Sequence, residues 1–152
     1  MNRHLNGGLT LIELIIVIAI IAVLAGLGYP LYTDYIIKSR RSDARVALEQ
    51  IAHAQERYNT VSNTYTDDLN LLNLSGPLND NIASDGDDNT TVSEAGYYTI
   101  TVNSGTVSAT AFDLSAAPVS GKSQANDTDC TGLTLDEQGI KGGSGADSSK
   151  CW

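Results

Sequence analysis

The stretch Gly8-Leu9-Thr10-Leu11-Ile12-Glu13-Leu14 decides how this chain is organised. It joins a short polar segment to a long apolar run and places a single acid at the start of that run. No charged residue occurs from Leu14 to Thr33. At 1.5 Å of rise per residue, this run is long enough to cross the hydrocarbon of a bilayer as a helix. Because a carboxylate at its edge is costly without a partner, Glu13 is predicted to have a function.

The helical pattern continues beyond the apolar run, but with one apolar face. Ala44, Leu48, Ile51, Gln55 and Tyr58 recur at helical spacing, and charged residues fill the other faces. This pattern predicts a membrane half over 9–35 and an amphipathic half over 36–58 that packs on its own domain.

A kink is expected near the end of the membrane half, at Gly26, Gly28 and Pro30. Proline cannot donate the helical hydrogen bond, and its ring clashes with the preceding turn. Residues 1–8 form a polar leader, too short for a secretory signal, that precedes the apolar run. The apolar anchor is therefore expected to stay on the mature protein.

The distal part of the chain changes from helical to strand patterns. Residues 59–95 are expected to form a loop-rich connection with one short helical turn. Strands are expected at 98–102, at 106–116 and around 133–135, where apolar and polar residues alternate. We therefore predict an α+β fold in which a three- or four-stranded antiparallel sheet, within 96–141, packs one face on the helix.

The charge balance is acidic, with 9 basic and 18 acidic residues and a net charge of −9. An acidic surface lacks the basic footprint of broad nucleic-acid binding, so binding to nucleic acid is expected to be absent or weak. The basic residues are concentrated just after the apolar run. Five of the nine lie in one 20-residue window: Lys38, Arg40, Arg41, Arg45 and Arg57.

Two cysteines, Cys130 and Cys151, lie near the C-terminus. In an acidic tail rich in Gly and Ser, the pair favours a disulfide in an oxidising compartment over two unrelated thiols. Such a bridge would stabilise the folded state by about 3 kcal/mol. The positive-inside rule opposes this placement, because Lys38, Arg40 and Arg41 after the anchor would keep the distal domain in the cytoplasm. We follow the cysteines and expect the distal domain on the oxidising side of the membrane.

The sequence contains no motif that is typical of an enzyme. Beyond the leader, His53 is the only histidine, and no nucleophile, P-loop, zinc or dinucleotide motif is present. The run Asp85-Gly86-Asp87-Asp88-Asn89 begins like a calcium loop, but Thr90 and Gly96 stand where glycine and glutamate are required. We expect a non-enzymatic protein with no metal and no cofactor.

The opening stretch resembles the processing site of type IV prepilins, with Leu9 where phenylalanine is usual. Pro30, Tyr32 and Tyr35 fall where type IVa pilins have a proline and two tyrosines. The ending Cys130-Thr131-Gly132-Leu133-Thr134-Leu135 … Cys151-Trp152 is similar to pilins of the PilE type. The resemblance covers most of the chain and implies the type IV pilin fold.

The resemblance also implies roles for single residues. A prepilin peptidase of the inner membrane would cut after Gly8 and methylate the amine of Leu9. Thr10 and Glu13 would act in subunit assembly, with Glu13 meeting the N-terminus of a neighbour. Cys130 and Cys151 would close the C-terminal D-region, 130–151. The implied partners are other pilin subunits, the peptidase and an inner-membrane assembly platform.

The residues and the resemblance are compatible with three functions. The leading one is a structural subunit of a type IV pilus of a Gram-negative bacterium, with its head periplasmic before assembly and extracellular in the filament. Such filaments serve adhesion, twitching motility or DNA uptake. The second is a membrane-anchored minor pilin acting as a tip adhesin or DNA-binding module. The third, a pseudopilin of type II secretion, is disfavoured because the main subunit of that family typically relies on calcium where this chain has its cysteine pair.

Overall fold

The computed structural model describes residues 10–83 and 88–152, without the side chains of residues 27–30. It divides into two compact units at Ile36 and Ile37. One helix, α1 (Leu11–Ser62), supplies most of the first unit and the first element of the second. We call the second unit, residues 37–152, the head.

The long helix α1 is 52 residues and outruns the predicted end at Tyr58. Its apolar first part is long and apolar enough to cross a membrane. The helix is unbroken through Gly26, Gly28 and Pro30, but the side chains of the last two lie outside the described residues. The kink there stays a prediction.

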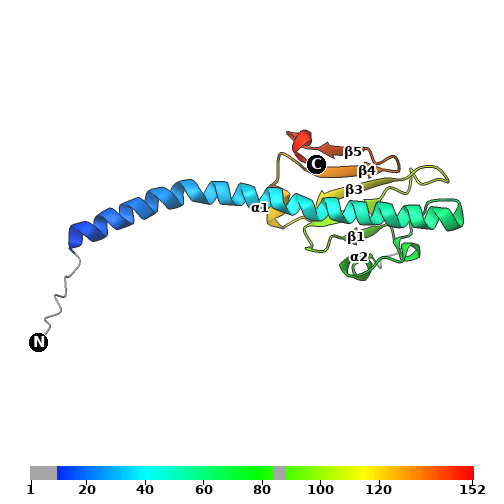
Figure 1. Cartoon of the computed structure of the whole chain (residues 1–152), viewed down its shortest axis with the longest axis horizontal. Coiled ribbons are helices and arrows are strands. Elements are labelled where there is room, and N and C mark those ends of the chain that lie inside the picture. The colour runs from blue at the N-terminus through cyan, green and yellow to red at the C-terminus, as the bar shows by residue number, and fades with distance from the viewer. Residues whose placement is uncertain (1–9, 84–87) are drawn as a thin grey trace, which may run out of the picture. The chain divides into compact units, whose positions relative to one another are not determined.

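The head contains one antiparallel sheet of five strands, in the order β1-β2-β3-β4-β5 (Figure 1). The strands are β1 (Thr90–Val92), β2 (Tyr98–Val102), β3 (Asp113–Pro118), β4 (Gly132–Asp136) and β5 (Lys141–Ser144). The prediction of three or four strands within 96–141 is therefore too small, because it lacks β1 and ends where β5 begins. β1 has only three residues, and β5 is a Lys-Gly-Gly-Ser segment without apolar alternation.

The predicted return strand at 106–116 is wrong in its bounds, because β3 begins at Asp113 and ends at Pro118. The residues before it form a loop that bonds elsewhere: Ser108 O accepts from Tyr65 N at 3.0 Å, and Ala109 O accepts from Asn59 Nδ2 at 3.2 Å. These backbone groups are therefore satisfied outside the sheet.

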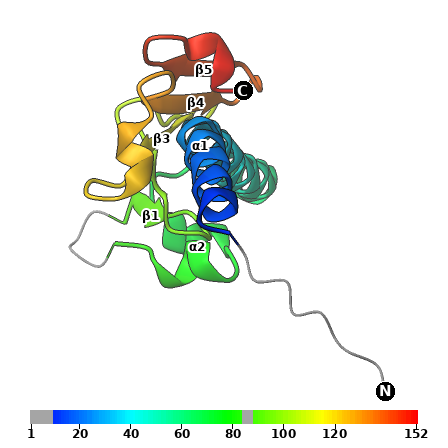
Figure 2. The same ribbon diagram turned by 90° about the vertical axis from the view of Figure 1, so that its left-hand side faces the viewer.

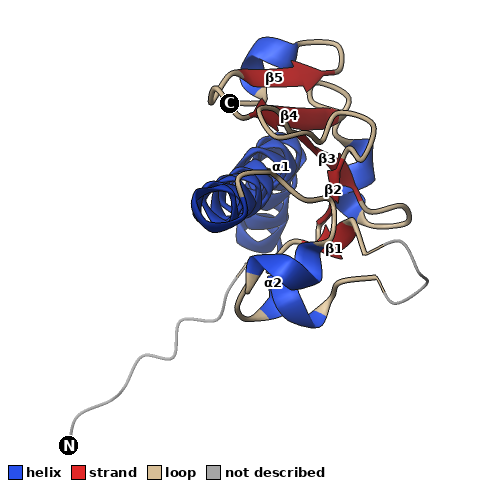
Figure 3. Cartoon of the chain, turned by 90° about the vertical axis from the view of Figure 1, so that its right-hand side faces the viewer, coloured by secondary structure: helices blue, strands red, loops and turns tan. Residues whose placement is uncertain are grey.

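Short helical elements fill the connections: η1 (Leu69–Leu72), α2 (Pro77–Asp80), η2 (Ser123–Asn126) and η3 (Ser148–Lys150). The predicted helical turn in the first connection is η1. α2 packs against β1, and η3 packs against β5, so both edges of the sheet have a neighbour (Figures 2 and 3).

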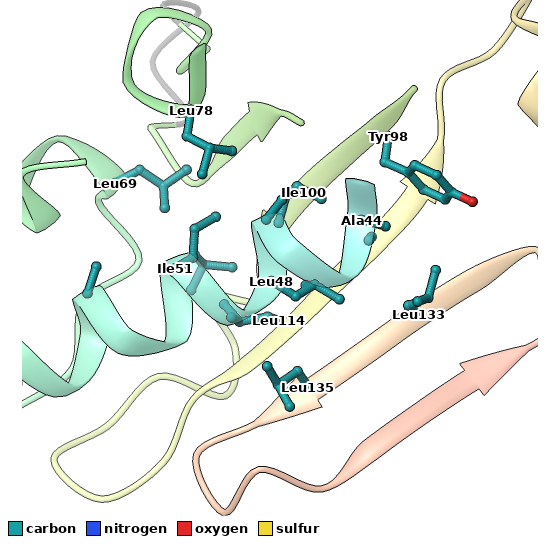
Figure 4. Packing of buried hydrophobic residues seen from close by; sticks show 14 of the residues in the cluster. Ala44, Leu48, Ile51, Leu69, Leu78, Tyr98, Ile100, Leu114, Leu133 and Leu135 are labelled. Carbon is teal, nitrogen blue, oxygen red and sulfur yellow. The ribbon is translucent and has the colours of Figure 1, made fainter. Parts of the chain in front are cut away.

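The core of the head lies between α1 and one face of the sheet (Figures 3 and 4). From α1, Ala44, Leu48 and Ile51 are fully buried, as the apolar stripe predicts. Opposite them lie Ile100, Leu114, Leu133 and Leu135, which alternate with more exposed residues along β2, β3 and β4. Every buried hydrophobic residue of this cluster falls between Ala44 and Cys151, so the head carries its own core and can fold as a fragment.

Candidate functional site

At the N-terminal end of α1, Thr10 and Glu13 form a reciprocal helix cap. Glu13 Oε2 accepts from the Thr10 backbone N–H at 2.9 Å and from its hydroxyl at 3.0 Å, while Thr10 Oγ1 accepts from Glu13 N at 3.3 Å. This is the capping-box arrangement, which satisfies helix donors that have no partner within the helix. The cap holds the Glu13 carboxylate at Thr10, which follows Leu9 in the sequence. Gly8 and Leu9, the predicted processing site, lie outside the described residues.

At the other end of the chain, Cys130 and Cys151 form a disulfide with a Cα–Cα distance of 5.3 Å. The bridge packs against the glycine-rich strand β5. A Cβ atom on Gly143 would lie 2.7 Å from Cys151 Sγ, so a larger residue there would displace the bridge. The absence of a side chain at Gly143 thus makes room for the disulfide.

A buried ion pair just before the D-region, with hydrogen bonds to the last residues of the D-region, ties this part of the chain to α1. Arg41 donates to Asp127 through Nε and Nη2, both at 2.7 Å, and the two side chains are only 3% and 2% exposed. Arg41 Nη1 reaches Lys150 O at 2.9 Å, and Arg45 Nε reaches Cys151 O at 2.8 Å. The hydrogen bond to Asp127 raises the pKa of Arg41. We call these contacts the D-region latch.

Around the latch, Asp127 and Gln124 organise the neighbouring loops. Asp127 Oδ1 also accepts from Cys130 N at 3.1 Å. Gln124 Nε2 donates to Asp127 at 3.2 Å and to the Tyr98 hydroxyl at 2.8 Å. Burial of Tyr98 raises its pKa to about 12. The predicted cluster of basic residues thus serves partly to stabilise the fold, because Arg41 is buried and its charge is neutralised by Asp127.

The remaining basic groups of the head differ in how they are compensated. Lys141 pairs with Glu49 at 3.0 Å, and Lys150 pairs with Asp129 at 3.0 Å and Asp147 at 3.1 Å. Among the residues that the structure describes, the other five form no ion pair with a carboxylate: Lys38, Arg40, Arg45, Arg57 and Lys122. Two of these, Arg40 and Lys122, meet at the ring of Tyr97. No sequence pattern predicts that meeting, because the residues are far apart in the chain.

Four acidic residues line a cleft on a different part of the head. This cleft, of about 440 Å³, lies between α1 and the turn that joins β4 to β5, and its apolar lining includes Phe112 and Leu135. Its acidic lining consists of Glu49, Glu56, Asp136 and Glu137. His53 also lines it, so this histidine borders the cleft. Within residues 10–83 and 88–152, no group of three or more His, Cys, Asp or Glu side chains is arranged to hold a metal ion.

A long N-terminal helix on an antiparallel sheet, with an apolar anchor and a C-terminal disulfide, defines the type IV pilin class. The prokaryotic N-terminal methylation motif matches residues 3–29 and marks the chain as a membrane-anchored precursor of this class. Over residues 30–134, the chain belongs to the family described as "Type IV minor pilin ComP, DNA uptake sequence receptor". It is thus a structural protein and not an enzyme, and the family favours the second of the functions weighed above.

Curated relatives match only part of the chain. The type IV major pilin protein PilA of Myxococcus xanthus is 37% identical over 67 residues, which cover 44% of this chain and 30% of the relative. The fimbrial protein EcpC of Eikenella corrodens is 50% identical over 44 residues, 29% of each protein. The chain thus matches less than a third of the length of these relatives.

Two solved structures are similar to the chain at low identity. The minor pilin PilV of Neisseria meningitidis has a TM-score of 0.48 and 21% identity, covering 75% of this chain and 92% of that one. A type IV pilin of Shewanella oneidensis has a TM-score of 0.43 and 22% identity, covering 76% and 97%.

Proposed function

We propose that this chain is a minor type IV pilin whose head binds DNA at the cell surface. The family match over residues 30–134 carries this proposal, because it spans most of the head. The precursor is held in the inner membrane by the apolar part of α1, with its head in the periplasm. After processing between Gly8 and Leu9 and methylation of Leu9, it enters the filament through α1.

The cap at Thr10 and Glu13 supports the assembly step. Both bonds from Thr10 fall on Glu13 Oε2, and among the described residues Oε1 accepts no hydrogen bond. A carboxylate can accept at both oxygens, so the same side chain can cap its own helix and still meet the Leu9 amine of a neighbouring pilin. This pairing is favoured in an apolar layer, where an isolated charge is costly.

A comparison of variants at position 13 tests the assembly step. Glu13→Ala should leave the subunit in the membrane and exclude it from sheared filaments, as measured by mass spectrometry of both fractions. Glu13→Gln keeps the side-chain volume and a cap acceptor but removes the charge, so it should fail in the same way. Normal incorporation of Glu13→Gln would show that the charge is not required.

For DNA binding, the relevant feature is the distribution of charge and not its total. The five basic groups without a carboxylate partner carry charges that no ion pair offsets and can attract phosphates, whereas the acidic cleft repels them. A net charge of −9 excludes strong nonspecific attraction, so binding should depend on a few contacts of the head. The composition alone predicts absent or weak binding to nucleic acid, whereas we propose that a few basic groups of the head bind DNA.

Duplex binding by the head fragment tests the DNA step. A fragment beginning at Thr33 is titrated against labelled duplex DNA, and anisotropy is followed at several salt concentrations. Each phosphate contact should contribute about 0.9 to the slope of log K against log salt. Neutralising Arg57 with glutamine should lower the slope if that group contacts a phosphate, whereas Lys141→Gln should not, because Lys141 is already paired with Glu49. If no duplex binds at low salt, or if all five unpaired cations can be neutralised without effect, the DNA proposal fails.

A further inference from the structure

We propose that Arg40, Tyr97 and Lys122 form a site for the phosphate of an anionic phospholipid headgroup, used while the subunit waits in the membrane. The site lies wholly within the head. It shares Arg40 and Lys122 with the cations considered for DNA, but it concerns the period before assembly and a different ligand.

Three separate segments of the head build this site. Arg40 lies on α1, Tyr97 lies in the connection that leads into β2, and Lys122 lies between β3 and η2. The guanidinium carbon of Arg40 is 4.1 Å from the centre of the Tyr97 ring, and Lys122 Nζ is 5.5 Å from it. The segments are tied together, because Val119 N donates to Tyr97 O at 2.9 Å and Arg40 Nη1 donates to the Ser123 hydroxyl. The two cations are therefore held at one ring.

The position of Lys122 depends on a glycine. Lys122 Nζ donates to Gly96 O. A Cβ atom on Gly96 would lie 3.0 Å from this ammonium, and the backbone there has a φ of +73°. Glycine both adopts that conformation at no steric cost and leaves room for the lysine. The approach of Lys122 to the ring is thus built into the turn.

The electrostatics of the site favour an anionic ligand. Among the described residues, neither Arg40 nor Lys122 forms an ion pair. The acid nearest to Arg40 along α1, Asp43, bonds to neither cation: its Oδ2 accepts from the Ser93 hydroxyl at 2.6 Å and its Oδ1 from Ala95 N at 3.1 Å. Cation–π contacts at exposed sites are worth only about 0.5–1 kcal/mol each and do not neutralise the charges. A phosphate would neutralise these charges, because the planar guanidinium of arginine binds it with two hydrogen bonds.

The location of Arg40 favours a lipid phosphate as the source. Arg40 follows Thr33, the last residue of the uncharged run, by seven positions, or about 10 Å of helical rise. A headgroup layer extends about 5–7 Å beyond the hydrocarbon on each side, and charges act over about another 8 Å at physiological salt. Lys38, which is exposed and also forms no ion pair among the described residues, precedes Arg40 on the same helix. An aromatic ring with adjacent cations is suited to this interface.

Vesicle binding by the head fragment tests the site. The fragment from Thr33 is sedimented with vesicles of phosphatidylcholine alone or with 30% phosphatidylglycerol, at low and at physiological salt. At about 1 kcal/mol per cation near an anionic surface, Arg40→Gln or Lys122→Gln should weaken binding about 5-fold, and the double variant about 30-fold. Tyr97→Phe should bind as the parent does, and Tyr97→Ala should bind more weakly. Lys141→Gln is the matched control, because Lys141 also lies over an aromatic ring, that of Trp152, but is paired with Glu49.

The outcomes separate lipid from the other phosphate sources. Equal binding to neutral and anionic vesicles, or unchanged binding by the double variant, overturns the site. If the double variant loses duplex DNA binding but keeps vesicle binding, the cations serve DNA and the lipid assignment is overturned. If inorganic phosphate shifts the Tyr97 ring resonances while anionic vesicles bind no protein, the site takes a free anion and not a headgroup. Far-UV circular dichroism confirms that each variant is folded.

Discussion

Removal of Asp127 from the D-region latch should be among the most damaging single changes in the head. Asp127→Asn keeps the size of the side chain but leaves Arg41 buried without a counter-charge. Breaking a buried pair by removing one partner costs about 3–5 kcal/mol, and a 3% exposed guanidinium has little access to water. The reciprocal change, Arg41→Met, leaves the carboxylate buried in the same way and should cost a similar amount.

The double replacement Arg41→Met with Asp127→Leu should be less damaging than either single change. It removes both charges together, and Lys150 O keeps Arg45 Nη2 at 3.5 Å while Gln124 Nε2 keeps the Tyr98 hydroxyl at 2.8 Å. The main remaining cost is the lost acceptor for Cys130 N, whose burial without a partner costs about 1–3 kcal/mol. The coupling free energy between the two positions should therefore be at least about 3 kcal/mol. The exposed pair Lys141–Glu49, with side chains 47% and 48% exposed, supplies the control, and Glu49→Gln should cost under about 1 kcal/mol.

The measurement is urea unfolding of the disulfide-bonded head fragment, followed by two signals. Far-UV circular dichroism reports mainly on α1, while fluorescence of Trp152, the only tryptophan, reports on the D-region. Coincident transitions would establish two-state unfolding, and the shift of the midpoint at constant slope gives the free-energy change. Single changes that cost less than 1 kcal/mol, or a double variant whose cost is the sum of the two, would refute the assignment of the latch as a coupled buried pair.

Three further predictions concern other parts of the head. Replacing Cys130 and Cys151 with alanine should lower the free energy of unfolding by about 3 kcal/mol, and equal urea midpoints with and without the bridge would contradict this. Stability should fall between pH 10 and pH 12 by up to about 1.4 kcal/mol per pH unit, because unfolded tyrosine releases its proton near pH 10 while Tyr98 keeps its proton up to a pKa of about 12. In Tyr98→Phe the decline should be shallower, and identical slopes would exclude Tyr98 as its source. Gly145→Ala should lower the melting temperature strongly, since its Cβ would lie 2.4 Å from Asp129 O at a φ of +130°, whereas Gly105→Ala meets open space and should be nearly neutral. Similar melting temperatures for the two alanine variants would disprove the steric argument.

The latch also offers a reason why basic residues follow the anchor despite the positive-inside rule. Arg41 is buried against Asp127, and Arg45 donates to the carbonyl groups of the D-region. These residues are needed by the folded head, so they bear less on membrane orientation than their number implies. The orientation that we favour, with the head on the oxidising side, agrees with the disulfide.

The sequence by itself determined the parts of this protein that depend on local periodicity. The uncharged run after Glu13 defines the apolar half of α1, and the stripe of Ala44, Leu48 and Ile51 defines the face that packs on the sheet. Alternation identifies β2 and β4 for the same reason, because each residue's burial follows from its position in a regular element. The opening stretch likewise carries the resemblance to prepilins, since a processing site is read as linear sequence.

Only the tertiary structure decided what depends on segments distant in the chain. The edge strands β1 and β5 carry too few apolar side chains to show a period, and their hydrogen-bonding partners define them. The burial of Arg41 is set by Asp127, 86 positions away. The approach of Arg40 and Lys122 to Tyr97 arises in the same way. The energy of a charge depends on its neighbours in space and on its access to water, and a linear pattern specifies neither.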